Sequence, residues 1–483
     1  FTVDENGNLV GTLVGTDTVA VRVELTPTQD GQNVNVEVKI IQELPLDHKD
    51  SGNGTYVSVD GDDIAIKVPV QAQDTDGDPL DNPATIDITI KDGANPVFGI
   101  DSGITINETT EADKIIAGQI PLDIGSDDIQ SIHFNATQEG LANITSNGDA
   151  TTYNVNGNVL TVIGSNLQPV MVVTIANDGT YTVKVTGAVD QNSADIAEIK
   201  LDVTATDKDG DTAQGELNIT INDGTDAVGG ENIDITLTEG DVDVDGSGTS
   251  TGGIDTTYPV EQSGQLTLVA GEDRLDPNTV AIGASQQADL IKELNAELTS
   301  SGQALTFTVD ANGNLVGTLA GTDTVAVRVE LTPIQDGQNV NVEVKIIQEL
   351  PLDHNASGDS AGFVTVNGND IAIKVPVQAQ DTDGDPLDNP ATIDITIKDG
   401  ANPVFGIDSG ITINETTEAD KIIAGQIPLD VGSDDIQSIH FNAAQDGLAN
   451  ITSNGEATTY NVNGNVLTVV DAQSQPVMVV TIA

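Results

Sequence analysis

Alternation of apolar and polar residues is the main pattern along this chain. Four clear examples are TVAVRVEL (18–25), VNVEVKII (34–41), DIAIKVPV (63–70) and TIDITI (85–90). An apolar or β-branched residue at every second position is typical of a half-buried β-strand, and the Gly, Asp and Asn residues between such segments mark turns. Many short strands separated by turns predict antiparallel β-sandwiches.

One stretch departs from this period. In SQQADLIKELNAELTSSG, which starts at Ser285, the apolar residues that share one helical face are Leu290, Ile291, Leu294 and Leu298. This spacing predicts a single short helix near 286–299, with Ser285 as its N-cap.

The sequence repeats with a long period. FTVDENGNLVGTL at Phe1 returns as FTVDANGNLVGTL at Phe307, and ANPVFGIDSGITINETTEADKIIAGQIPLD at Ala94 returns at Ala401, which gives a period of 306 to 307 residues. The one-residue slip lies between LPLDHKDSGNGTY and LPLDHNASGDSAGF. A slip at this Gly/Ser stretch predicts an exposed loop that tolerates insertion.

A shorter formula recurs within the long period. Segments ending at Gly93, Gly224 and Gly400 close on D-x-D-G-D, a strand and D-G, and IAGQIPLDIGSDDI from Ile116 echoes QSGQLTLVAGEDRL from Gln262. Two module types are therefore predicted to alternate. The predicted modules are 1–93, the C-terminal part of a larger type; 94–224, complete; 225–400, complete, larger and carrying the helix; and 401–483, the N-terminal part of the 94–224 type. The predicted fold class is all-β, with tandem immunoglobulin-like antiparallel β-sandwiches in a linear array.

Composition excludes several kinds of site and partner. Aromatic residues make up 2% of the chain and Cys and Trp are absent, so no disulfide framework, thiolate metal site or stacking platform is expected. With 77 acidic and 16 basic residues the net charge is -61, which repels nucleic acid and anionic membranes. So much carboxylate favours Ca²⁺ as a counter-ion. We also expect no membrane insertion, because no apolar run approaches ~20 residues, and no signal peptide opens the chain.

The first group of candidate ligands is acidic and sits between the last two strands of each module. Its three sets are Asp74, Asp76 and Asp78; Asp207, Asp209 and Asp211; and Asp381, Asp383 and Asp385. The order D-x-D-G-D resembles the start of an EF-hand loop but lacks its spacing and its final Glu. We favour a calcium loop, with a plain Asp-Gly hairpin turn as the alternative.

The second group lies at the module boundaries and at the ends of first strands. It consists of Asp92 with Asn95, Asp223 with Asp226, Asp399 with Asn402, and Glu108 and Glu239. In an immunoglobulin-like sandwich the last hairpin lies at the N-terminal end, so Asp207, Asp209 and Asp211 should face Asp92, and the third set should face Asp223. Each boundary would then collect carboxylates from both neighbours. Two alternatives stay open, namely sites confined to one module and ordinary linker chemistry.

No catalytic constellation is predicted. The histidines are His48, His133, His354 and His440, two positions repeated once each, and no zinc cluster or Ser/His/Asp set follows from them. A glycosidase would need aromatic platforms, and no phosphate-binding G-x-x-x-x-G-K occurs. We therefore expect no enzyme. DVDVDGSGTS, from Asp241, is interpreted as a solvated loop, with an extra ion site as the alternative.

With its closing formula, the chain resembles the immunoglobulin-like (BIg or cadherin-like) extender repeats of giant bacterial RTX adhesins exported by type I secretion. The resemblance covers essentially the whole chain, although 225–400 is longer than a plain extender. It implies a secreted cell-surface protein, anchored in the outer membrane through other regions, in which Ca²⁺ stiffens repeats that project adhesive domains for attachment and biofilm formation.

The implied partners are neighbouring repeats of the same chain, in a monomeric filament, and a host-cell or biofilm-matrix ligand reached through other regions. The competing hypothesis is a carbohydrate- or protein-binding adhesive module with its ligand site in 225–400, motivated by the extra length and the helix of that module.

Overall fold

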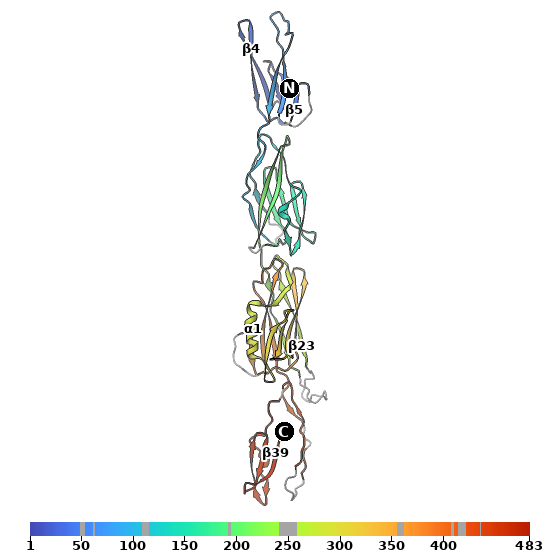
Figure 1. Ribbon diagram of the computed structural model, residues 1–483, viewed down its shortest axis with the longest axis vertical. Helices are drawn as coiled ribbons and strands as arrows, with labels where there is room; N and C mark the ends of the chain where they lie inside the picture. The colour runs from blue at the N-terminus through green and yellow to red at the C-terminus, as the bar shows by residue number, and fades with distance from the viewer. Residues whose placement is uncertain are drawn as a thin grey trace. The chain divides into compact units, whose positions relative to one another are not determined.

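The described part of the chain is mainly β-strand with one α-helix (Figure 1), as seen in a computed structural model. The described residues are 1–48, 54–60, 63–108, 115–191, 195–240, 258–354, 362–368, 370–406, 410–413, 422–434 and 436–483. They form two compact units. Unit 1 comprises Phe1–Asp226, Gly271–Arg274 and Thr382–Asp385, and unit 2 comprises Ala227–Ala270, Leu275–Asp381 and Pro386–Ala483. The all-β fold class is confirmed, and the sheets are antiparallel except where noted below.

Unit 1 begins with two small sheets. The first has the order β1 (Thr2–Val3), β2 (Leu9–Thr12), β3 (Val19–Asp30), β4 (Asn33–Gln42), and the second has the order β5 (Val57–Asp60), β6 (Asp63–Val70), β7 (Ala84–Lys91). All four segments predicted from alternation are strands here. The predicted insertion loop lies largely outside the described residues, as does 241–250.

A two-sheet sandwich follows in unit 1. One sheet has the order β10 (Ile115–Gln119), β18 (Thr180–Val185), β17 (Pro169–Ile175), β16 (Val159–Ile163), β15 (Thr152–Asn156), and the other β12 (Ile129–Phe134), β19 (Ile196–Asp207), β20 (Thr212–Asn222), β9 (Ile104–Asn107). Short pairs are β8 (Val97–Phe98) with β11 (Leu122–Asp123) and β13 (Thr145–Ser146) with β14 (Asp149–Ala150). β9 runs parallel to β20, with Asn107 opposite Asn222. This register brings Glu108 and Asp223, the next residues along, to the same end of the sheet.

A buried tyrosine joins the two sheets of this sandwich. Tyr181 is 1% exposed, and its hydroxyl donates a hydrogen bond to Asp101 Oδ2 at 2.9 Å. The same oxygen accepts the N–H of Asn218, in β20, at 2.8 Å. Burial, followed by the hydrogen bond to Asp101, raises the pKa of Tyr181. The hydroxyl therefore stays protonated and acts as a donor.

Replacing Tyr181 by phenylalanine should weaken this sandwich by about 1–3 kcal/mol, because it removes a donor from a buried carboxyl group. Amide hydrogen exchange in β18 and β20 of the full chain would report the loss as faster local opening. Tyr56→Phe is the matched control, because Tyr56 is 58% exposed. Equal protection of β18 and β20 in both variants would contradict the prediction.

Unit 2 contains a larger sandwich. Its seven-stranded sheet has the order β21 (Val228–Gly229), β23 (Val260–Val269), β29 (Asn339–Gln348), β28 (Val325–Asp336), β27 (Leu315–Leu319), β26 (Gln303–Val309), β25 (Thr299–Ser300). The facing sheet has the order β22 (Ile233–Thr238), β32 (Ala391–Lys398), β31 (Asp370–Asp381), β24 (Leu275–Ile282), with β30 (Val364–Asn367) also paired to β31. β22 runs parallel to β32, with Thr238 opposite Lys398. Glu239 and Asp399 consequently lie at one end of this sheet.

The remaining elements of unit 2 are short. They are β33 (Val404–Phe405) paired with β34 (Leu429–Asp430), β35 (Thr452–Ser453) paired with β36 (Glu456–Ala457), and the sheet β37 (Thr459–Asn463), β38 (Val466–Val470), β39 (Pro476–Thr481). Within the described ranges there are also two single 3-10 turns, η1 (Glu139–Leu141) in unit 1 and η2 (Asp446–Leu448) in unit 2. No helix of the described residues is long and apolar enough to cross a membrane.

The helix α1 (Ala284–Glu297) packs on the larger sandwich beside β26, β30 and β31 (Figure 1). Leu290, Leu294 and Leu298 are fully buried, as the helical spacing predicts. The predicted N-cap is wrong: the helix begins at Ala284, its N-cap is Gly283, and no side chain caps it. The reason is tertiary, since Gly283 donates to the carbonyl of Pro376 at 2.9 Å and so fixes where the chain turns.

Two strands with the same sequence, NVNVEVKIIQ, differ in burial. In β29 the apolar residues Val340, Val342, Val344 and Ile346 are 0% exposed, because β23 pairs beside them and the facing sheet packs over them. In β4, the last strand of its described sheet, the equivalent residues are exposed: Val34, Val36, Val38 and Ile40. Local sequence therefore forms the strand, and the elements that pack around it decide its burial.

Candidate metal centres

The D-x-D-G-D turns give their first aspartate a structural role. Asp207 Oδ1 accepts the backbone N–H groups of Gly210 at 3.0 Å and Asp211 at 2.8 Å. Gly210 has a φ of 115°, which a residue with a Cβ rarely adopts. Asp74 caps its turn similarly, accepting the N–H of Asp78 at 2.9 Å. In these two sets the first aspartate therefore caps its own turn. Ligand oxygens of Asp74, Asp76 and Asp78, and likewise of Asp207, Asp209 and Asp211, lie within 4.8 Å of one another, so a calcium loop stays a prediction.

The middle aspartates have different surroundings. Four carboxylates meet near Gly224, and we name this group the Gly224 cluster: Glu108, Asp223, Asp273 and Asp383. Oxygens of the first three lie within 4.8 Å of one another. Glu108 is 3% and Asp273 4% exposed, so most of this negative charge is removed from water. All four residues belong to unit 1.

The electrostatics of the Gly224 cluster are those of an uncompensated acidic site. Burial raises the pKa of Asp273 to about 9, and the charges of Glu108 and Asp383 raise it further. Burial likewise raises the pKa of Glu108 to about 8 and that of Asp223 to about 6. Carboxylates that repel one another in a low-dielectric site hold protons or bind a cation.

Short hydrogen bonds fix the orientation of Glu108. The backbone N–H of Val189 donates to Oε1 at 2.6 Å, and Gln191 Nε2 donates to Oε2 at 2.5 Å. Unit 2 repeats this arrangement at Glu239, where the N–H of Leu352 donates to Oε1 at 2.8 Å. The residue two positions after the backbone donor differs between the two sites. It is Gln191 in V-D-Q and His354 in L-D-H.

The group at the other end of the small sandwich contains a histidine. This Gly93 cluster consists of His48, Asp92, Asp127 and Asp209. His48 Nδ1 lies 3.5 Å from Asp92 Oδ1 and 3.8 Å from Asp209 Oδ2, and the three side chains are 7%, 10% and 4% exposed. Burial raises the pKa of Asp127, with further contributions from Asp209 and Asp92. The position of the last hairpin predicts that the second acidic set faces Asp92, and Asp209 of that set lies beside it.

In unit 2 the corresponding Gly400 cluster consists of Glu239, His354, Asp399 and Asp434. His354 Nδ1 lies 3.5 Å from Glu239 Oε2, and the side chains are 5% and 0% exposed. Ligand atoms of Glu239, His354 and Asp399 lie within 4.8 Å of one another. Burial raises the pKa of Glu239 to about 8, and burial followed by the charge of Asp399 raises the pKa of Asp434.

Other predicted ligands lie outside these three clusters. Asp385, two residues after Asp383, lies close to Asp223. Burial raises the pKa of Asp223, and the charges of Asp383 and Asp226 raise it further. Asp381 is buried at the end of β31. The exposed residues are Asp74, Asp76, Asp78, Asn95 and Asn402.

Sequence reasoning missed one recurring ligand position. Asp127, Asp273 and Asp434 each end a G-x-D motif, in GSD, GED and GSD. In each motif the backbone N–H of the middle residue donates a hydrogen bond to a carbonyl of the linker. The acceptors are Ala94, Thr225 and Ala401, each two residues after the boundary aspartate. The signal was present in the aligned openings GSDDI and GEDRL. The histidines also differ from expectation, because His48 and His354 lie inside acidic clusters.

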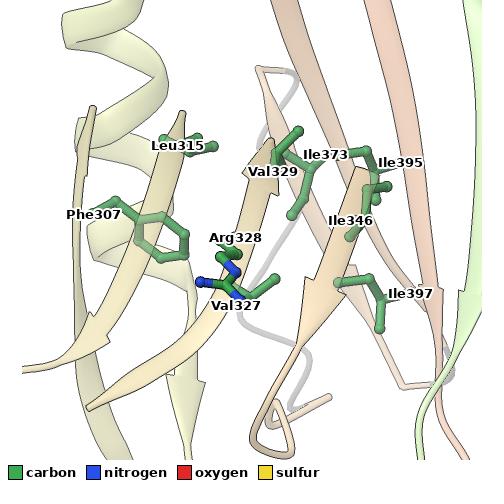
Figure 2. Close-up of a pocket in the computed structure, with 9 residues that line it drawn as sticks. All are labelled: Phe307, Leu315, Val327, Arg328, Val329, Ile346, Ile373, Ile395 and Ile397. Carbon is green, nitrogen blue, oxygen red and sulfur yellow. The ribbon is translucent and has the colours of Figure 1, made fainter. Parts of the chain in front are cut away.

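The larger sandwich has a small apolar cavity rather than a ligand-sized one. Figure 2 shows it between Phe307, Leu315 and isoleucines of the facing sheet, and its volume is about 10 Å³. Small-molecule sites usually measure roughly 300 Å³ or more. Arg328 lies at its edge but pairs with Glu330 and Glu349. This cavity does not support a ligand site in 225–400.

No protein-family model and no curated protein matches the chain. Among solved structures it is similar to extracellular cadherin domains 3–6 of protocadherin gamma B2, with 10% identity, 88% of this chain and 84% of that chain covered, and a TM-score of 0.23. It is also similar to the CupB6 tip adhesin from Pseudomonas aeruginosa, with 12% identity, 63% and 98% covered and a TM-score of 0.23. A third similar structure is that of mouse clustered PcdhgC3 EC1-3, with 11% identity, 69% of this chain and 77% of that chain covered, and a TM-score of 0.21. These neighbours are extracellular domains and an adhesin, and scores this low carry no argument about function.

Proposed function

We propose that this chain is the calcium-stabilised repeat region of a large secreted adhesin of the bacterial cell surface. In this role it is a rigid extender that projects adhesive domains, carried elsewhere in the parent protein, for surface attachment and biofilm formation. The repeated β-sandwiches and the recurrence of acidic clusters beside Gly93, Gly224 and Gly400 support the proposal. The observation that carries it is the Gly224 cluster.

Calcium fits the residues of the Gly224 cluster. Ca²⁺ takes six to eight oxygen ligands, from carboxylates above all. Glu108, Asp223 and Asp273 offer oxygens within 4.8 Å of one another, and Asp383 adds a fourth carboxylate nearby. Taking charges of one sign out of water costs several kcal/mol per ion unless an opposite charge is present. A divalent cation supplies that charge.

The cluster joins segments that are far apart in the sequence. Glu108 follows β9, Asp223 follows β20, Asp273 lies between β23 and β24, and Asp383 lies in the turn after β31. Without a cation these carboxyl groups must take up protons or move apart, and either costs free energy at neutral pH. With calcium they share one ion, and the linker that contains Asp223 loses its freedom to bend. Calcium would therefore stiffen the chain outside the cell, where it is plentiful.

Small-angle scattering of the full chain tests this proposal. In calcium we expect a longer maximum dimension and a narrower distribution of shapes than in a calcium chelator, with recovery when calcium is restored. The matched variant is E108Q/D273N, which keeps side-chain volume but removes two ionisable ligands, and its profile should no longer respond to calcium. A wild-type profile that is the same in calcium and in chelator would rule out the calcium-dependent extender.

A further inference from the structure

We propose that the Gly93 and Gly400 clusters, which contain His48 and His354, are sites for a late first-row transition-metal dication such as Zn²⁺. The Gly224 cluster, made of carboxylates alone, remains the calcium site. The inference rests on the proposed function in one respect, since it assigns a second kind of ion to alternate clusters of the same extender. It is carried by geometry, burial and ligand chemistry.

The distances around the imidazoles are those between ligands of one ion. His48 Nδ1 is 3.5 Å from Asp92 Oδ1 and 3.8 Å from Asp209 Oδ2, and His354 Nδ1 is 3.5 Å from Glu239 Oε2. A charged imidazolium bonded to a carboxylate would close to about 2.7–2.9 Å. Ligands about 2.0–2.2 Å from a tetrahedral zinc lie roughly 3.4 Å apart.

The burial of the His48 and His354 ring nitrogens is a second observation, independent of the distances, that points to a bound ligand. The side chain of His48 is 7% exposed, and neither of its ring nitrogens has a hydrogen-bond partner among the described residues. His354 is 5% exposed, and its Nδ1 and the facing Glu239 Oε2 also have no hydrogen-bond partner there. Buried polar atoms nearly always have partners, so each such atom needs an explanation. A bound cation explains all of them at once.

The second nitrogen of His354 is held as in a metal-binding histidine. His354 Nε2 lies 3.3 Å from the carbonyl oxygen of Ile397. A carbonyl only accepts, so Nε2 carries the proton and Nδ1 presents its lone pair toward Glu239. A backbone carbonyl that fixes the tautomer of a ligating imidazole is a recurring outer-shell partner of metal sites.

The chain contains its own comparison for this position. The backbone N–H of Val189 donates to Glu108, and that of Leu352 donates to the equivalent residue Glu239. Two residues later stand Gln191 and His354, respectively. Where the side chain is Gln191 the nearby ligands are all oxygens, which suits calcium. Where it is histidine one ligand is an imidazole nitrogen, which suits zinc, copper or nickel and not calcium.

The test is a zinc titration of the full chain in calcium-saturated buffer, by calorimetry. We expect two tight sites in the wild type and none in H48Q/H354Q, since loss of a ligand costs more than the roughly 10- to 100-fold in affinity lost with an outer-shell partner. Co²⁺ absorption gives a spectroscopic signature of nitrogen ligation that a purely structural histidine would not produce. Far-UV circular dichroism in calcium checks that the variant folds.

Matched variants sharpen the result. H133Q/H440Q should keep both zinc sites, because neither histidine belongs to a cluster, and Q191H should gain a third. Tight zinc binding that survives in H48Q/H354Q, or is absent from the wild type, would overturn the proposal. The scattering experiment is independent of this one, so a chain that ignores calcium but loses zinc in H48Q/H354Q would refute the extender and leave the histidine sites standing.

Discussion

Replacing Asp273 by asparagine is expected to stabilise the chain in a calcium chelator and to destabilise it in calcium. Without calcium, the folded chain buries this group, whose pKa is raised to about 9, in a cluster of carboxylates. At neutral pH folding must then protonate it, at about 1.4 kcal/mol for each pH unit above the unfolded pKa. Asparagine removes that cost. In calcium the same change removes a ligand, and the stabilisation by bound calcium falls with it.

Thermal unfolding of the full chain in chelator and in calcium measures both effects. Asp234→Asn is the control, because it makes the same chemical change at an exposed position in β22 and should alter neither value. A change of the same sign in both buffers would show that Asp273 acts only through packing or folding.

The second large effect concerns pH. In chelator the chain should lose stability as the pH rises from about 5 to 9. Burial raises the folded-state pKa of Glu108 and Glu239 to about 8 and that of Asp273 to about 9, whereas unfolded carboxyls titrate near about 4. Between these values the folded chain binds more protons than the unfolded chain, so the free energy of unfolding falls with rising pH. Bound calcium keeps Glu108 and Asp273 ionised and should flatten their part of the slope.

Urea unfolding across this pH range, with and without calcium, would measure the slope. The variant E108Q/E239Q/D273N cannot titrate at these positions, and its stability in chelator should fall much less with pH over the same interval. The remaining slope should lie near pH 6, where Asp207 and Asp223 titrate because burial raises their pKa to about 6. If the wild-type chain instead became more stable as the pH rose in chelator, the clusters would not carry the buried charge that their geometry indicates.

Most of the fold is predictable from the sequence, because alternation is a local property. The strands β3, β4, β6 and β7 and the apolar face of α1 follow from it. The predictions that fail concern features that distant segments of the chain determine. β4 and β29 share one sequence, yet only β29 is buried, since β23 pairs beside it and the facing sheet packs over it. The start of α1 likewise depends on Pro376, almost a hundred residues further on, which the helical pattern at Ser285 does not contain.

The candidate sites are predictable in part for the same reason. A repeated formula singles out Asp92, Asp223 and Asp399. The parallel pairing of first and last strands brings Glu108 to Asp223 and Glu239 to Asp399. The sequence cannot separate Asp207, which caps its own turn, from Asp209, which faces His48, because both stand in one D-x-D-G-D. His48 and His354 look unremarkable in the sequence, since their carboxylate neighbours come from distant strands.

The parallel pairing of first and last strands also bears on how a sandwich responds to tension. A pull applied between the entry of β9 and the exit of β20 runs along the two strands in opposite directions, so it loads the hydrogen bonds between them in shear. Rupture then requires several bonds to break together rather than one after another. The pairing spans Ile104 to Asn107 in the small sandwich and Ile233 to Thr238 in the large one. Under a steadily rising force the small sandwich should therefore yield first.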